Sequence, residues 1–456
     1  MRHLRALSGR RFAACQNFSA GSSFSELPTF YREPVARFYP LNLIRIATLG
    51  LCGFATTNPL MSAQQTPLLH WTGSWACSQQ IPEPANALAS EELRHALLRQ
   101  IVHLSIGGDR IRVRVSNTFG TQPLHLASVH IARPLSSTGS AIGTATDRSL
   151  SFNNAMDVTI PAGAEYLSDP IEFHAPPLSN LSITLQFEDP PVGETSHPGS
   201  RATSYLSTTG NPASHDLPDA KRIDHWFQLS GVDVAATTQA SALVALGDSI
   251  TDGHGATTNG NDRWPDILSA RLQTTPTTRF ISVLNQGIGG NHLLTDGLGP
   301  NALARFDRDV LAQPGVKYVL VLEGVNDLGG ATRVSEISQA EHDALVARVI
   351  GAYTQMIERA HVHGLRIFGG TITPYTGSDY YHPGSMSEAD RQKINTWIRS
   401  AGHFDASIDF DKAIADPADP KRMLPAYDSG DHLHPSPAGY KAMAGAVPLA
   451  LFNTNP

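Results

Sequence analysis

The chain has 456 residues, of which 41% are hydrophobic and 16% charged, enough for two or three packed domains and too apolar for a disordered protein. Its net charge of −7 is uneven: residues 1–63 hold seven arginines and two acidic residues, so 27 of the 34 basic and 39 of the 41 acidic side chains lie beyond them. An acidic body without a basic stripe excludes nucleic-acid binding and gives no electrostatic reason to bind an anionic membrane.

Residues 1–63 are predicted to be a leader that contains an export signal. Arg45 precedes the apolar run 46–55, and the small residues Ser62 and Ala63 offer a cleavage point before Gln64. The run is too short to cross a bilayer. We therefore expect a secreted or periplasmic protein without a stable membrane span after processing. A membrane anchor or a disordered leader is the alternative, and the long lead-in leaves the true start open.

Residues 64–239 are predicted to form an all-β, sandwich-like domain. Short alternating runs separated by Pro, Gly, Ser and Asn are typical of antiparallel sheets. We expect strands at 101–106, 110–115, 127–131, 157–160 and 181–187. Gly107-Gly108-Asp109 predicts a hairpin between the first two. The alternating Arg110, Arg112 and Arg114 are interpreted as the solvent-exposed face of a strand, with a ligand-facing stripe as the alternative.

Residues 240–456 change to alternating strands and helices. Buried strands are expected at 242–246, 280–284, 317–322 and 365–368. Helices are expected within 335–363, from a capping box at 385–388 to Gly402, and from Ser436-Pro437 towards Phe452. This order predicts a parallel sheet with helices on both faces.

Polar or glycine-rich segments follow three of these strands. Gly247-Asp248-Ser249 ends the first, 285–291 follows the second, and 323–327 follows the third. In a parallel sheet these ends lie side by side, where open α/β folds bind ligands. Ser249 is therefore a candidate nucleophile, although Asp and Ser also favour turns and helix caps.

The remaining requirements of acyl transfer are also present. A serine hydroxyl needs an adjacent base, which His434 can supply, and the base needs an orienting group such as Asp431. The tetrahedral intermediate needs preorganised donors, which the N–H groups of Ser249 and Gly290 and the amide of Asn326 can provide. From the residues alone, Gly287 and Gly289 compete with Gly290, and His432 competes with His434.

These segments resemble the SGNH (GDSL-type) hydrolase superfamily of esterases and lipases over residues 240–452. Its sequence blocks are matched in order by 247–251, 285–290, 324–327 and 431–434. The resemblance implies a three-layer α/β/α, flavodoxin-like fold, no metal or other cofactor, and a Ser249–His434–Asp431 triad. It also implies an oxyanion hole of Ser249, Gly290 and Asn326. With 98–102 and 115–120, the chain further resembles a bacterial subgroup of secreted arylesterases and acylhydrolases linked to xylan breakdown.

We thus predict an exported serine esterase that hydrolyses short acyl, aryl or carbohydrate esters of small molecules or polysaccharides. The alternatives are a lysophospholipase or thioesterase of the same fold, or a carbohydrate-binding protein without catalysis. Metallohydrolases are disfavoured because no His-Glu-x-x-His set occurs, and Thr251 breaks the Gly-x-Ser-x-Gly elbow of α/β-hydrolase lipases.

Several neighbouring residues have two possible roles. We interpret Asp248 as a structural hydrogen bonder, and Asp252 and Asp327 as caps or braces of loops. Pocket lining and ordinary packing are both open for His254, His292 and Trp264. The aromatic segment 375–382 is a candidate substrate wall or lid, with a surface loop as the alternative.

Overall fold

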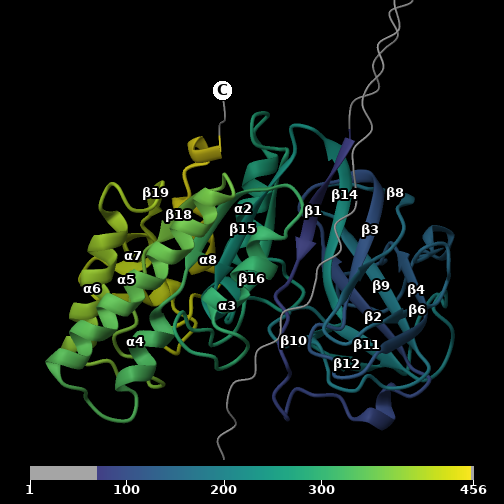
Figure 1. Cartoon of the computed structure of the whole chain (residues 1–456), viewed down its shortest axis with the longest axis horizontal. Helices are drawn as coiled ribbons and strands as arrows, with labels where there is room; N and C mark the ends of the chain where they lie inside the picture. Colours follow the sequence, from purple (N-terminus) through teal and green to yellow (C-terminus); the bar gives the residue numbers. More distant parts are fainter. Residues whose placement is uncertain (1–68, 453–456) are drawn as a thin grey trace, which may run out of the picture. The chain divides into compact units, whose positions relative to one another are not determined.

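The computed structural model describes residues 69–452, so the predicted leader, residues 1–63, lies outside the described residues. The described chain begins with a region built mostly of strands and continues with alternating strands and helices (Figure 1). Both predicted fold classes are confirmed: an antiparallel, sheet-rich region is followed by a three-layer α/β/α region.

Two antiparallel sheets share one apolar core in the β-rich region. The first sheet comprises β1 (Leu69–Ala76), β14 (Leu229–Thr237), β3 (Gly108–Ser116), β7 (Glu165–Leu167) and β8 (Ile171–Ala175). The second comprises β12 (Lys221–Ile223), β11 (Ser204–Ser207), β2 (Leu97–His103), β9 (Asn180–Phe187), β4 (Leu124–Ala132), β5 (Arg148–Ser149) and β6 (Val158–Ile160). A short pair, β10 (Ser196–His197) and β13 (Trp226–Phe227), lies outside both.

The predicted hairpin at residues 107–109 is wrong. β2 and β3 belong to different sheets, because β2 pairs with β9 and β11 whereas β3 pairs with β14, β7 and β8. The connection crosses the sandwich and is held by hydrogen bonds from Leu104 N to Ser179 O and from Ser105 N to Ser74 O, both 2.9 Å. Alternation identifies each strand but says nothing about its partner.

The prediction of a solvent-exposed arginine face on β3 is also wrong for two of its three arginines. Arg112 Nε lies 2.9 Å from Oδ2 of Asp233, a fully buried carboxylate on β14. Arg114 is buried, donates to Gln313 Oε1 at 2.7 Å, and faces the other oxygen of Asp233. Arg110 alone of the three is well exposed, where it pairs with Glu172. A buried acid on the neighbouring strand makes possible the burial of Arg114 and the partial burial of Arg112.

The second region is built on a five-stranded parallel sheet. Its order is β16 (Ile281–Gly287), β15 (Ser241–Gly247), β17 (Val316–Leu322), β18 (Arg366–Gly370) and β19 (Ala406–Ile408). The first four match the predicted strands, whereas the three-residue β19 was not predicted. Gly247 is in register with Gly287 on one side and with Leu322 on the other. The polar segments that follow these three strands therefore meet at one edge. A two-stranded ribbon of β20 (Ala415–Asp416) and β21 (Asp419–Met423) lies apart.

Helices cover this sheet (Figure 1). They are α1 (Ser249–Asp252), α2 (Trp264–Gln273), α3 (Ala302–Phe306), α4 (Val325–Thr332), α5 (Gln339–Val362), α6 (Ser385–Arg399), α7 (Phe410–Ile414) and α8 (Pro437–Ala446). α5 and α6 pack on each other and on β18, while α2 packs on β16 and α8. Within residues 69–452, none of the helices combines the length and apolar character that crossing a bilayer requires.

Two predicted helix starts have different outcomes. α8 begins as expected, with the Ser436 hydroxyl accepting from Gly439 N. The capping box at 385–388 is wrong, because Gly384 is the N-cap of α6 and the carboxylate of Glu388 binds Arg391 at 2.7 Å instead. The buried Arg391 therefore binds the Glu388 carboxylate, which in a capping box would accept from the backbone at the start of the helix.

The two regions have separate apolar cores but are joined by buried polar contacts. Ser105, between β2 and β3, binds the Ser269 hydroxyl at 2.7 Å and accepts from Val283 N at 2.8 Å. The described residues, 69–452, belong to one compact unit. β14 ends at Thr237 and β15 begins at Ser241, while the division into domains 64–239 and 240–456 stays a prediction.

Candidate active site

A tight turn at the end of β15 positions Ser249. Gly247 is required there, because a Cβ would lie 2.1 Å from Thr251 Oγ1. Asp248 caps α1, its Oδ1 accepting from Ile250 N at 2.9 Å, which confirms its structural role. Burial raises the pKa of Asp248 to about 7. Ser249 is the first residue of α1 and lines a cavity of about 860 Å³.

His434 and Asp431 lie beside this hydroxyl. Ser249 Oγ is 2.8 Å from His434 Nε2, and His434 Nδ1 is 2.6 Å from Asp431 Oδ2. The other carboxylate oxygen accepts from the backbone N–H of His434 at 2.8 Å and of Leu433 at 3.0 Å. These bonds with His434 and Leu433 hold the pKa of Asp431 well below its usual range, although partial burial opposes them.

The structure also separates the two histidines that the sequence left open. His432 points to a different carboxylate, with Nδ1 2.6 Å from Asp428 Oδ2, and its ring is about half exposed. His434 is buried and makes the contact with Ser249. The Asp-x-x-His spacing therefore identifies the histidine that meets the hydroxyl.

The three predicted oxyanion donors border the same cavity. Ser249, Gly290 and Asn326 all line it. Among residues 69–452, neither Ser249 N nor Gly290 N finds a hydrogen-bond acceptor. Gly290 has φ +69°, and a Cβ there would meet Leu298 at 2.9 Å, so glycine suits the position on both counts.

The amide of Asn326 is fixed at both ends. Its Nδ2 donates to Asn291 O at 2.6 Å, and its Oδ1 accepts from the hydroxyl of Tyr381 at 2.6 Å. One N–H of the amide is left for a ligand. Tyr381 lies in the predicted wall segment 375–382, but its contact with Asn326 was not predicted, since no local pattern links residues 55 positions apart.

The other candidate residues either stabilise the surrounding structure or line the cavity. Asp252 Oδ1 lies 2.9 Å from His197 Nε2, and Asp327 Oδ2 accepts a hydrogen bond from Leu293 N at 2.8 Å. Both aspartates therefore brace loops, as expected. Trp264 packs in the core. Cavity-lining residues outside the proposed triad and oxyanion hole include His254, His292, Leu298, Tyr380, Tyr381 and Leu433.

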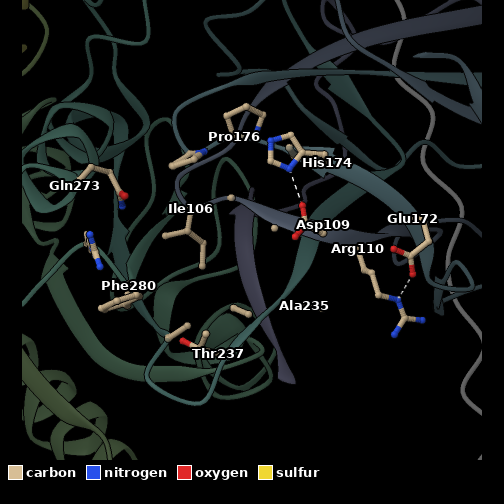
Figure 2. Close-up of a pocket in the computed structure, with 17 residues that line it drawn as sticks. Ile106, Asp109, Arg110, Glu172, His174, Pro176, Ala235, Thr237, Gln273 and Phe280 are labelled. Carbon is tan, nitrogen blue, oxygen red and sulfur yellow. Dashed lines mark hydrogen bonds and ion pairs between the residues drawn. The ribbon is translucent and has the colours of Figure 1, made fainter. Parts of the chain in front are cut away.

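A second cavity of about 670 Å³ shares no lining residue with the first. It lies between β3, β8, β14 and the segment that joins α2 to β16. Figure 2 shows two ion pairs at it: His174 Nδ1 is 2.6 Å from Asp109 Oδ1, and Arg110 Nε is 2.9 Å from Glu172 Oε1. Its lining, all within the described part of the chain, includes no serine or cysteine. This cavity therefore offers no side chain that could act as a serine or cysteine nucleophile.

A metal ion is conceivable at one set of described residues. Ligand atoms of His254, Asp431 and His434 lie within 4.8 Å of one another. However, the two ring nitrogens of His434 already bind Asp431 and Ser249. A metal at this set would have to break those contacts, so the arrangement fits proton transfer better than metal ligation.

Part of the chain is similar to known proteins. Among solved structures, a GDSL-like lipase from Bacteroides thetaiotaomicron is 18% identical, with a TM-score of 0.35 over 47% of this chain and 90% of that chain. An acetyl xylan esterase from Geobacillus stearothermophilus is 21% identical, with a TM-score of 0.35 over 47% and 97%. No curated protein matches the chain. Residues 245–442, which contain Ser249, Gly290, Asn326, Asp431 and His434, match the model of the GDSL-like lipase/acylhydrolase family and belong to it.

Proposed function

We propose that the protein is a carboxylic ester hydrolase in which Ser249 is the nucleophile, His434 the general base and acid, and Asp431 the group that orients His434. One observation carries the proposal: the unbroken chain of contacts from Ser249 Oγ to His434 Nε2 at 2.8 Å and from His434 Nδ1 to Asp431 Oδ2 at 2.6 Å. A serine hydroxyl becomes an effective nucleophile only beside such a base.

The reaction follows from these contacts. Ser249 Oγ bonds to the ester carbonyl carbon while its proton moves to His434 Nε2. The tetrahedral intermediate collapses, the bond from carbon to the alcohol oxygen breaks, and the alcohol leaves with the proton of His434. Water then attacks the acyl-serine in the same way, releasing the acid and restoring Ser249. Asp431 accepts from Nδ1–H throughout, which keeps Nε2 directed at the hydroxyl.

The negative oxygen of each intermediate requires donors that are already in place. The N–H groups of Ser249 and Gly290 and one N–H of the Asn326 amide are the candidates. Removing one donor of this kind typically lowers kcat by about 10²–10³-fold.

The cavity supports esters with modest apolar groups. Leu298, Leu433, Tyr380 and Tyr381 supply apolar and aromatic surface beside Ser249. We propose short acyl, aryl or carbohydrate esters, including polysaccharide esters, as substrates. Export to the periplasm or outside the cell, based on the leader in residues 1–63, belongs to the same proposal.

The test compares Ser249→Ala with the natural protein on p-nitrophenyl acetate. We expect hydrolysis to be abolished and fluorophosphonate labelling to disappear, with the thermal midpoint within a few degrees. His434→Ala and His432→Ala form a matched pair: the first should reduce kcat by several orders of magnitude and the second by less than about tenfold. Full activity in Ser249→Ala would refute the proposal. A panel from acetyl to palmitoyl esters, with acetylated xylan and lysophosphatidylcholine, separates an esterase from a lysophospholipase.

A further inference from the structure

A segment of the β-rich region reaches the proposed triad. From the last residue of β10, residues 197–201 pass beside α1, the helix that begins with Ser249. His197 donates to Ser78 O at 2.8 Å from Nδ1 and binds Asp252 at 2.9 Å through Nε2, and both side chains of this pair are buried. Gly199 lies so close that a Cβ would be 1.8 Å from Asp252 Oδ2. These contacts fix the segment against the nucleophile helix.

Arg201 is the residue that this segment presents to the site. Its φ of +49° is unusual for a side chain with a Cβ, and its carbonyl accepts from Asn259 N at 2.8 Å. Its Nη2 lies 3.1 Å from His254 Nδ1. Non-glycine residues remain in the left-handed region where surrounding contacts impose it, often beside functional sites. The backbone at Arg201 is held in a conformation that brings its guanidinium to His254.

This contact determines the tautomer of His254. A guanidinium only donates, so Nδ1 of His254 accepts and the ring proton is on Nε2. Nε2 lies 3.9 Å from Asp431 Oδ2, too far for a hydrogen bond but close enough for its N–H dipole to attract the carboxylate. The ring centroid of His254 is 4.0 Å from that of His434, with the planes 37° apart.

The backbone of His254 is also fixed. Its N–H donates to Ser249 O at 2.9 Å, and its carbonyl accepts from the Tyr440 hydroxyl at 2.6 Å. These bonds hold the backbone of His254 beside the turn of Ser249, while its side chain is half exposed and contacts Arg201.

The charges around His254 favour its neutral form. Burial, His434 and Arg201 lower the pKa of His254 to about 4, against the opposing effects of Asp431 and Asp252. Two imidazoles 4.0 Å apart do not readily carry a charge together. A proton released by Ser249 is thus directed to His434.

We propose that Arg201 of the β-rich region and His254 form a positioning pair that holds Asp431 and His434 in the arrangement needed for proton transfer. This inference rests on the proposed esterase function. It gives the β-rich region a part in the active site: its segment 197–201 keeps His254 in the tautomer that supports the triad.

The experiment uses the full chain with Arg201→Ala, Arg201→Lys and the matched control Arg110→Ala, an exposed arginine at the other cavity. Nuclear magnetic resonance follows the ring signals of His254 from pH 4 to 8, and steady-state kinetics cover the same range. We expect Arg201→Ala to raise the His254 titration midpoint, add a second ionisation to the acidic limb of kcat/KM, and lower kcat about tenfold with KM within twofold. Arg201→Lys should restore much of the loss, and Arg110→Ala should match the natural protein.

Two variants of His254 distinguish the effect of its N–H on Asp431 from the effect of its ring on His434. His254→Gln keeps an N–H directed towards Asp431 and should retain more kcat than His254→Phe, which keeps only a ring against His434. An unchanged titration midpoint and pH profile in Arg201→Ala would overturn the inference, as would a rise in KM alone. If the natural protein neither hydrolyses esters nor reacts with a fluorophosphonate, the proposed function fails, and the His254 titration then reports separately whether Arg201 controls that ring.

Discussion

At the scale of single residues, the least expected contact is the one that orients Asn326. An amide side chain presents a donor at one end and an acceptor at the other, and a half-turn exchanges them. The Tyr381 hydroxyl binds Oδ1 at 2.6 Å, so the nitrogen must face Asn291 O and the cavity. Burial raises the pKa of Tyr381, so the hydroxyl stays a donor over the working pH range.

Replacing Tyr381 by phenylalanine should therefore weaken the oxyanion hole without removing a donor. We expect Tyr381→Phe to lower kcat about tenfold with little change in KM, less than the roughly 10²–10³-fold effect typical of deleting a donor outright, as in Asn326→Ala. Steady-state kinetics on p-nitrophenyl acetate measure kcat and KM for both variants. Tyr380→Phe is the matched control, because its hydroxyl binds Arg333 at the surface and should change kcat less than twofold. Equal kcat values for the two variants would show that Asn326 is oriented without Tyr381.

At the scale of elements, one buried arginine ties α3 to the strand ends beneath Ser249. Arg305 Nη2 donates to Gly247 O at 3.0 Å, and Nη1 donates to Gln286 O at 2.7 Å and to Ser78 Oγ of the β-rich region at 2.8 Å. It also pairs with the buried carboxylates of Asp309 and Glu323. The ends of β15 and β16, and hence the nucleophile turn, depend on this side chain.

Replacing Arg305 by methionine would leave Glu323 without its cation and leave Asp309 with Arg308 alone. Breaking a buried ion pair in this way usually costs about 3–5 kcal/mol. We expect a loss of that size in the free energy of unfolding of Arg305→Met, measured with urea, and a smaller loss in Arg305→Lys, which keeps the charge. The control Arg94→Ala removes an exposed pair with Asp189 and should change stability by less than about 1 kcal/mol. A loss below 1 kcal/mol in Arg305→Met would contradict this account.

At the scale of the whole molecule, the sequence predicts what depends on local pattern and misses what depends on distant partners. The parallel strands, α5 and the placement of Ser249 at a sheet edge follow from periodicity and strand ends. The exchange of sheets between β2 and β3, the burial of Arg114 against Asp233, and the approach of Arg201 to His254 do not. Each of these features depends on a strand or loop that is distant in the sequence, and no local sequence pattern identifies that partner.

Burial of acidic groups in the α/β region also sets a pH dependence for the molecule. Asp248 has a pKa of about 7 in the folded protein because of burial, whereas an aspartate in an unfolded chain ionises near about 4. Between these values the folded state keeps a proton that the unfolded state has released. The contribution of Asp248 to stability is therefore fully present below about pH 4 and is lost as the pH rises through about 7.

Asp248→Asn should remove this dependence, because asparagine stays neutral and still offers Oδ1 to Ile250 N. We expect the variant to gain stability relative to the natural protein, by about 1 kcal/mol at pH 5 and up to about 4 kcal/mol at pH 8, at about 1.4 kcal/mol for each unit of pKa difference. Urea unfolding at several pH values measures the gain. Asp296→Asn is the control: hydrogen bonds with Asn301 lower the pKa of that exposed carboxyl, so its titration falls below this range. Parallel stability curves for Asp248→Asn and the natural protein would mean that Asp248 is already ionised in the folded state, and that the nucleophile turn holds a buried negative charge beside Ser249.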